Sequence, residues 1–370
     1  MLRRLPAFLL VYAQVGYPAV LAAWAKVEGP AGLDAPPAPS TEELPPVTLV
    51  IAAYNEGAVI TQKVENALAL DYPRDRLQVI VTADGCTDDT VERARAAGAD
   101  IVLDLPRGGK VRAQDAAVRE AEHDLIAFSD ANALLEPDAL RELVAPFTDG
   151  ADRGDGARIG YVCGQVTFVN EAGTNQEGLY WRYEMAIRAL ESRLASVTGG
   201  NGAIYATRRA AYVEMDERMG HDLSFPFTLV KRGWRAVYRP SARATEKMVP
   251  SVEGEWRRKR RMMSHAWPIV VEGGLLDPRG YPPRYAFMVA SHRALRYAAP
   301  FLHLAALAWK PSRRASVLLL AAALLGDKVK ARPLLVARYY VLTQASIAMG
   351  LHDYARHGTP AGWSAPEGTR

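Results

Sequence analysis

The sequence has little cysteine and little net charge, and both shortages exclude classes of protein. Its 370 residues include two cysteines, Cys86 and Cys163, without CxxC or Cys/His spacing, which excludes a disulfide framework and a cysteine-based zinc site. We expect both to be small core residues. The net charge is +4, with acidic residues frequent up to about Asp155 and basic runs at 257–261 and 313–314. Nucleic-acid binding needs a broader basic face, so we expect no nucleic-acid partner.

The start of the chain is apolar. Residues 6–25 carry no formal charge and are flanked by Arg3, Arg4 and Lys26, and this is about the length of one bilayer span. We predict a retained membrane anchor over residues 1–27, because a signal peptide has a shorter apolar run and a small-residue cleavage site. The alternative is a helix packed on the domain. Residues 28–46 are rich in Pro, Ala and Gly, which predicts a linker.

The end of the chain is apolar as well. Residues 297–309, 315–325 and 333–349 are apolar and separated by basic junctions, and Arg338 interrupts the last segment. The first two are shorter than a membrane span. Residues 281–357 therefore predict membrane-associated helices, either as full spans or as re-entrant or interfacial helices. A loop-like tail follows at 358–370.

Strand and helix signals alternate in the first half of the chain. Short apolar runs at 47–53, 77–82, 101–105 and 125–130 are each followed by a helical pattern. This order predicts an α/β fold with a mostly parallel, doubly wound sheet flanked by helices. Ligands of such sheets bind beyond the carboxyl ends of the strands. We therefore expect the loops that carry Glu56, Asp84 and Asp130 to converge at one edge.

The end of the fourth predicted strand has the residue types of a metal and phosphate site. Asp130 and Asn132 offer a carboxylate and an amide oxygen, which suit Mg²⁺ or Mn²⁺ carrying phosphates. For Asp130 alone, capping of the next helix is the alternative role. Lys110 follows two glycines and is a compact charge suited to a diphosphate. Its alternative is a solvated lysine in a surface turn.

Several segments, taken in order, resemble the inverting family 2 glycosyltransferases of GT-A fold. Ala-Tyr-Asn-Glu at 53–56, Ala-Asp-Gly-Cys-Thr-Asp at 83–88, Gly-Gly-Lys at 108–110 and Ser-Asp-Ala-Asn at 129–132 resemble the nucleotide-sugar half. Gly-Gly-Asn-Gly at 199–202 resembles the acceptor-side segment, and Gly-His-Asp-Leu at 220–223 stands where the family has an acidic pair. The resemblance covers about 47–267 and extends faintly into the flanking apolar segments, as in the branch with cellulose and hyaluronan synthases.

This resemblance implies a domain division and a set of site residues. It places a GT-A catalytic domain at 47–280, with a nucleotide-sugar half at 47–150 and an acceptor half at 151–280. Asp84 would hold the base or ribose, and Asp130 with Asn132 would hold the metal. Asn132 replaces the family's commoner second Asp, and one charge fewer should weaken divalent binding. The implied substrate-binding residues in these two halves are Tyr54, Glu56, Asp84, Lys110, Asp130, Asn132, Gly200 and Asn201.

Asp222 is the predicted catalytic base, because inverting transfer needs a carboxylate to take the proton of the acceptor hydroxyl. The alternative is a helix cap. His221 stands in place of the family's first acidic residue. Arg258 and Arg261 match the Gln and Arg of the Gln-x-x-Arg-Trp segment of processive members and would hold the diphosphate. Met262 replaces the Trp, which argues against processive polymerisation. The alternative for this basic run is a helix face on anionic lipid.

Together these features predict a membrane-associated inverting glycosyltransferase with Mg²⁺ or Mn²⁺ as cofactor. It would move a sugar from a nucleotide-diphosphate sugar to a glycan or lipid-linked acceptor, with the catalytic domain facing the cytoplasm. One alternative is a sugar-phosphate nucleotidylyltransferase, which should have a glycine-rich loop near its first strand, where this chain has Ala-Ala-Tyr-Asn-Glu. The other is a non-catalytic GT-A subunit of a synthase complex, which Asn132 and His221 leave open.

Overall fold

The computed structural model describes residues 2–29, 43–148, 158–169, 177–247, 252–329 and 331–362. Residues 30–42 of the predicted linker and 363–370 of the predicted tail lie outside the described residues. The chain forms two compact units, which we describe separately. The helical unit comprises Met1–Pro30, Ala172–Thr198 and Glu255–Thr359, and the sheet unit comprises Ala31–Glu171, Gly199–Gly254 and Pro360–Arg370.

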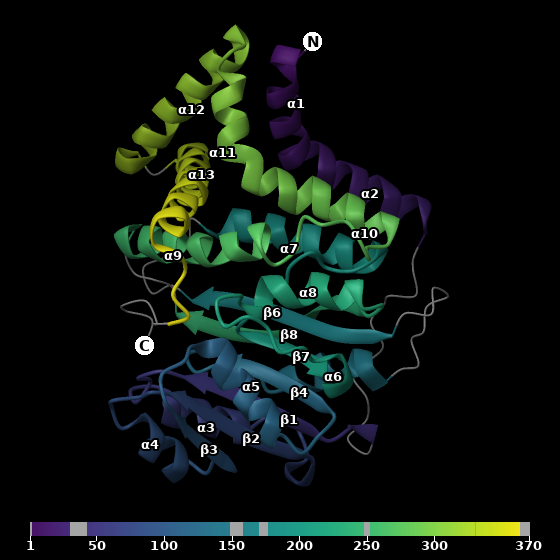
Figure 1. Cartoon of the computed structure of the whole chain (residues 1–370), viewed down its shortest axis with the longest axis vertical. Coiled ribbons are helices and arrows are strands. Elements are labelled where there is room, and N and C mark those ends of the chain that lie inside the picture. The colour runs from purple at the N-terminus through teal and green to yellow at the C-terminus, as the bar shows by residue number, and fades with distance from the viewer. Residues whose placement is uncertain are drawn as a thin grey trace. The chain divides into compact units, whose positions relative to one another are not determined.

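The sheet unit is built on one eight-stranded sheet in the order β3-β2-β1-β4-β7-β6-β8-β5 (Figure 1). The strands are β1 (Val47–Ala53), β2 (Leu77–Asp84), β3 (Ile101–Leu105), β4 (Leu125–Asp130), β5 (Leu134–Leu135), β6 (Ile159–Val169), β7 (Ile204–Arg208) and β8 (Arg235–Lys247). β1 to β4 pair in parallel, and β7 runs antiparallel to both β4 and β6. β8 is parallel to β6 and antiparallel to β5. The prediction of a mostly parallel α/β sheet is confirmed.

Helices cover both faces of the parallel part of the sheet. The helices of this unit are α3 (Ile60–Leu68), α4 (Thr90–Ala96), α5 (Lys110–Glu120), α6 (Ala139–Thr148) and α8 (His221–Lys231). Every residue of β1 and β2 is buried, as expected of parallel strands covered on both sides. Ile51 pairs with Ser129 and Val81, so Ser129 and Val81 share one face and Thr82 points to the other. Ser129 bonds to α3 and Thr82 to α5, so these helices lie on opposite faces.

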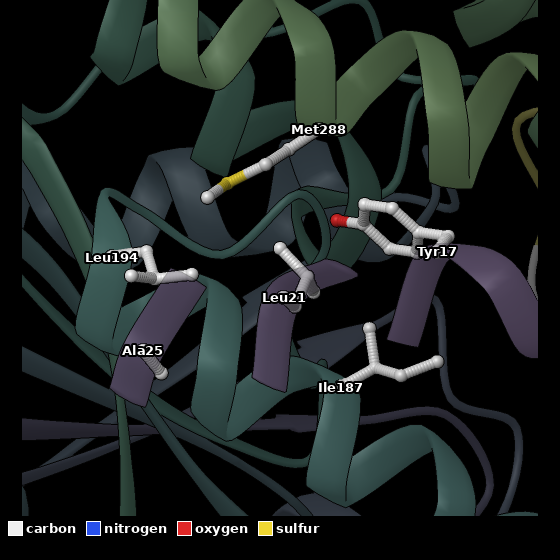
Figure 2. Packing of buried hydrophobic residues seen from close by; sticks show 6 residues of the cluster. All are labelled: Tyr17, Leu21, Ala25, Ile187, Leu194 and Met288. Atoms are coloured by element: carbon white, nitrogen blue, oxygen red, sulfur yellow. The ribbon is translucent and has the colours of Figure 1, made fainter. Parts of the chain in front are cut away.

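The helical unit combines the two ends of the chain with two internal helices. Its helices are α1 (Leu5–Val11), α2 (Tyr17–Val27), α7 (Glu177–Leu194), α9 (Val252–Val271), α10 (Pro283–Met288), α11 (Leu295–Ala306), α12 (Lys310–Lys328) and α13 (Arg332–His357). One core cluster joins Tyr17, Leu21 and Ala25 of α2 to Ile187 and Leu194 of α7 and Met288 of α10 (Figure 2). Helix α7 and nearly all of α9 belong to the same unit as the terminal helices, although the predicted range 47–280 includes them.

Parts of the helical unit have the character of membrane segments. Within the described residues, Leu5–Val27 and Arg332–His357 are long and apolar enough to cross a bilayer, by length and composition only. Helix α12 leaves Val317, Leu318 and Leu324 between 60% and 75% exposed, and its first turns carry exposed Arg313 and Arg314. An exposed apolar face beside cations is typical of an interfacial helix. The two apolar ends agree with the predicted membrane-associated helices.

Candidate active site

The loop after β1 is joined to the loop after β2 by side-chain hydrogen bonds. Asn55 has a φ of 52°, a left-handed conformation that Asn tolerates better than most residues. Its Oδ1 accepts a hydrogen bond of 2.7 Å from the Thr87 N–H, and the Glu56 N–H donates to Thr90 Oγ1 at 2.8 Å. The Glu56 side chain is 1% exposed. Glu56 therefore lies beneath this loop, whereas Tyr54 lies partly exposed on it.

Asp84, the last residue of β2, holds the loop that leads into α5. Its carboxylate is 3% exposed and accepts hydrogen bonds from Arg107 Nη1 at 2.6 Å and from the N–H groups of Gly108 at 2.6 Å and Gly109 at 3.0 Å. Gly109 has a φ of 96°, and a side chain there would collide with a backbone carbonyl. The Arg107 guanidinium lies over the Tyr54 ring, 3.3 Å from its centroid. In this structure both Asp84 oxygens are engaged by the protein itself.

Lys110 and Asp130 meet at the end of β4. Lys110 is the first residue of α5, and its ammonium forms an ion pair with the Asp130 carboxylate, with the two side chains 20% and 17% exposed. It also donates to the Gly202 carbonyl at 3.3 Å. Lys110 is thus not a solvated surface lysine. Asn132 is partly exposed, and Ala131 between Asp130 and Asn132 is buried, so both predicted metal ligands are accessible from solvent.

Asp222 lies in the first turn of α8, next to the glycine-rich segment. Asp222 is exposed. The helix N-cap is Gly220, without a side-chain capping bond, so Asp222 does not serve as the cap. Its backbone carbonyl accepts a 2.6 Å hydrogen bond from the Gly200 N–H. A Cβ on Gly202 would lie 3.5 Å from the Asp222 Cβ and 3.7 Å from Lys110 Nζ. Gly202 therefore brings the predicted base close to the predicted phosphate-binding lysine.

Asn201 offers one hydrogen-bond donor to this site. Its Oδ1 accepts a 3.0 Å hydrogen bond from the Ala203 N–H, which shapes the segment. Its Nδ2 has no hydrogen-bond partner among the residues that the structure describes. A buried amide donor without a partner costs free energy. A ligand oxygen at this position would remove that cost.

His221 is a core residue beneath Asp222. It is 4% exposed, its ring stacks on Phe225 with centroids 4.0 Å apart, and its Nδ1 lies 2.8 Å from the Tyr205 hydroxyl. Burial, followed by the charge of Lys110, lowers the pKa of His221 to about 3. The imidazole is therefore neutral at neutral pH, so Asp222 has an uncharged neighbour where the family has a carboxylate.

Arg258 and Arg261 lie on α9 in the helical unit. Arg258 forms an ion pair of 2.9 Å with Glu255, and burial, together with the charge of Arg258, lowers the pKa of Arg261. These arginines belong to the helical unit, and Asp130 belongs to the sheet unit. Their contact with a diphosphate stays a prediction.

Three residues of the site were not among those predicted. Asn55 lies inside the Tyr-Asn-Glu segment, and Arg107 directly precedes the Gly-Gly-Lys segment. Both could have been predicted as site residues from these neighbouring segments. Lys63 of α3 is fully buried and bonds to Ser129 beside Asp130. Lys63 could have been noticed in the sequence, because it stands at a position on the apolar face of α3 where an apolar residue is expected.

Comparison with known sequences identifies relatives of the whole sheet-forming region. A family model described as "Glycosyltransferase like family 2" matches residues 45–264. A poly-beta-1,6-N-acetyl-D-glucosamine synthase from Staphylococcus aureus (strain COL) is 24% identical over 233 residues, which are 60% of this chain and 55% of the relative. An N-acetylglucosaminyltransferase from Rhizobium sp. (strain N33) is 27% identical over 251 residues, 60% of this chain and 54% of the relative. The chain spans about half the length of these curated relatives.

One solved structure is similar over nearly the whole chain. It is a mannosyltransferase from Pyrobaculum calidifontis in complex with GDP-Man and Mn²⁺, with a TM-score of 0.72 and 23% sequence identity. The match covers 96% of this chain and 99% of the mannosyltransferase chain. The two proteins share a fold.

Proposed function

Because the chain belongs to the glycosyltransferase-like family 2, we propose that it is an inverting glycosyltransferase. It moves a sugar from a nucleotide-diphosphate sugar to a glycan or lipid-linked acceptor. The main supporting observation is the meeting of Lys110, Asp130 and Asp222 around Gly202. These side chains supply a cation for the diphosphate, a carboxylate for a divalent ion and a carboxylate for the acceptor proton.

Asp222 is the proposed catalytic base. Its exposed carboxylate takes the proton of the acceptor hydroxyl while the acceptor oxygen bonds to the anomeric carbon. The bond between that carbon and the diphosphate breaks in the same step, and its electron pair leaves with the diphosphate. Because this is a single displacement, the sugar is inverted and no covalent enzyme intermediate forms. His221 is neutral and buried, so it takes no part in this proton transfer.

Lys110 is the proposed partner of the departing diphosphate. Its ammonium forms an ion pair with Asp130. A diphosphate at this position would compete for the ammonium, because its two phosphates together carry two negative charges and one carboxylate carries one. Asp130 is then released for a divalent ion. Lys110 thereby couples binding of the donor to exposure of the Asp130 carboxylate.

The residues present fit Mg²⁺ or Mn²⁺. Asp130 and Asn132 are both partly exposed in the same short turn, and Mg²⁺ commonly takes one or two carboxylates together with substrate phosphates and water. Within the described ranges there is no group of three or more His, Cys, Asp or Glu side chains that could form a complete protein cage. When bound, the ion would supply positive charge to the leaving diphosphate.

The donor, the acceptor and the location are part of the same proposal. The names of the two relatives refer to N-acetylglucosamine, and the mannosyltransferase was solved with GDP-Man. UDP-N-acetylglucosamine and GDP-mannose are therefore the first donors to test. Leu5–Val27 and Arg332–His357 are the proposed membrane anchors, and the proposed location of the sheet unit is the cytoplasmic side.

Release of nucleoside diphosphate tests this function. Full-length protein in detergent is incubated with each donor, Mn²⁺ and a lipid extract, with Asp222→Asn as the matched control. We expect acceptor-dependent release of UDP or GDP by the wild type and little by the variant. Pyrophosphate release would favour a nucleotidylyltransferase. Donor binding without release from any common donor would favour the non-catalytic subunit and contradict the enzyme.

A further inference from the structure

Lys63 is a charged residue in a position that suits an apolar one. It is 0% exposed and lies on the buried face of α3 with Ile60, Val64 and Ala67. Burial of an ammonium costs free energy unless hydrogen bonds replace its water. Its Nζ donates to Ser129 Oγ at 2.7 Å and to the Ala133 carbonyl. Both acceptors are neutral, so a hydrophobic residue of the same length would avoid the cost of burying the charge.

These two acceptors flank the turn that carries the proposed metal ligands. The turn is closed by a 3.2 Å hydrogen bond from the Ala133 N–H to the Asp130 carbonyl. Ser129, Ala131 and Ala133 are at most 1% exposed, whereas Asp130 and Asn132 are partly exposed. The buried side of the turn is therefore made of small residues, which leave room for the Lys63 ammonium. The two partly exposed residues of the turn are the proposed oxygen ligands.

Lys63 and Lys110 approach the end of β4 from opposite faces of the sheet. Burial lowers the pKa of Lys63 to about 7, and the nearby charge of Asp130 acts in the opposite direction. Ser129 and Asp130 are consecutive residues of one strand, so their side chains point to opposite faces of the sheet. Lys63 thus approaches the turn from the α3 face, while Lys110 of α5 approaches it from the other face.

We propose that Lys63 is a positioning residue for the Asp130–Asn132 turn. By holding Ser129 and Ala133 from the buried side, it sets the spacing and direction of the Asp130 carboxylate and the Asn132 amide oxygen. This role rests on the proposed function, because it concerns the binding of a divalent ion with the nucleotide. Groups that orient metal ligands typically contribute a factor of about 10 to 100 in metal affinity.

The test compares Lys63→Met with a matched control on the same helix. Asn66, one turn further along α3, bonds to the backbone N–H and carbonyl of Leu135, both at 2.9 Å, and so braces the chain beyond the turn. Binding of UDP and GDP to the full-length protein is measured by calorimetry with and without Mn²⁺, beside the melting temperature. For Lys63→Met we expect an unchanged or higher melting temperature and at least about a tenfold loss of the affinity gain caused by Mn²⁺. Asn66→Ala should lower the melting temperature and keep the gain.

Each other outcome contradicts a specific part of the reasoning. If Lys63→Met keeps the wild-type gain, Lys63 is only a core residue. The same conclusion follows if Asn66→Ala loses the gain to the same extent, because the loss would then reflect lower stability and not the contacts of Lys63. If Lys63→Met does not fold, Ser129→Ala removes one acceptor and should lose part of the gain; an unchanged gain there overturns the proposal. If Mn²⁺ gives the wild type no gain, the metal site fails and Lys63 loses this role, whereas metal-free nucleotide binding would still support donor binding.

Discussion

Replacing Asp84 by Asn should weaken both the folded state and nucleotide binding. The Asp84 carboxylate is buried and serves three donors, namely Arg107 Nη1 and the N–H groups of Gly108 and Gly109. Asn keeps the shape but has a single acceptor oxygen, so its NH₂ group must face one of these donors. The loop before Lys110 then loses its charged anchor. Lys110, and Arg107 whose guanidinium lies over Tyr54, should then be held less firmly in position for nucleotide binding.

The structure sets the size of this effect. A hydrogen bond to a charged group contributes about 1.5–3 kcal/mol net. The contact with Arg107 contributes less, because the Arg107 side chain is 34% exposed and solvent screens it. The Asn variant loses the carboxylate charge and gains a repulsive contact between its NH₂ group and one donor. Together these changes should lower the free energy of unfolding by about 2–4 kcal/mol. For a domain of roughly 200 residues this lowers the melting temperature by roughly 5–12 °C.

Thermal unfolding and calorimetry with UDP and GDP measure the two effects. Asp104→Asn is the matched control, since Asp104 is an exposed carboxylate on the adjacent strand β3. It should behave as the wild type. If Asp84→Asn melts within about 1 °C of the wild type and keeps its nucleotide affinity, the argument from these contacts is refuted. An unchanged melting temperature with lost affinity would instead favour the direct contact with base or ribose that the family resemblance implies.

Three further predictions concern Asp222, Lys110 and His221. Asp222→Asn should lower the transfer rate by about two to four orders of magnitude with little change in donor affinity; near-normal transfer would place the base elsewhere. Lys110→Met should weaken UDP and GDP binding but strengthen binding of Mn²⁺ alone, because Asp130 loses its ion pair; weaker Mn²⁺ binding in calorimetry would contradict this. The pKa of His221 is lowered to about 3, so the unfolded chain binds the extra proton and the wild type loses stability as the pH falls below the ordinary histidine value. Between pH 7 and pH 5, the free energy of unfolding measured in urea should therefore fall by about 2 kcal/mol more in the wild type than in His221→Phe. An equal fall in both proteins would contradict a buried neutral imidazole.

The parallel half of the fold was predictable, because its strands are short apolar runs and β1 and β2 are buried along their whole length. The apolar runs at 47–53, 101–105 and 125–130 coincide with β1, β3 and β4. β8 escaped prediction, since Arg-Ala-Val-Tyr-Arg-Pro-Ser-Ala-Arg lacks an apolar run and contains Pro240, and Pro disfavours a strand. In the structure, pairing with β6 passes from Tyr238 directly to Arg243. Pro240 therefore lies in an irregularity, where the missing N–H breaks no regular ladder.

Site positions could be predicted from short segments, but the partners of their side chains could not. Asp84 and Asp130 were predicted because each ends a buried strand, which places it at the ligand edge. Whether such a carboxylate is free or already engaged depends on loops from other parts of the chain. Arg107 and Lys110 form ion pairs with these two carboxylates. Under the proposed function, a diphosphate donor would exchange these ion pairs for its own. Because each pair is partly buried, its strength depends on the geometry of the loop at 107–110 more than on the acidic residues that the sequence makes conspicuous.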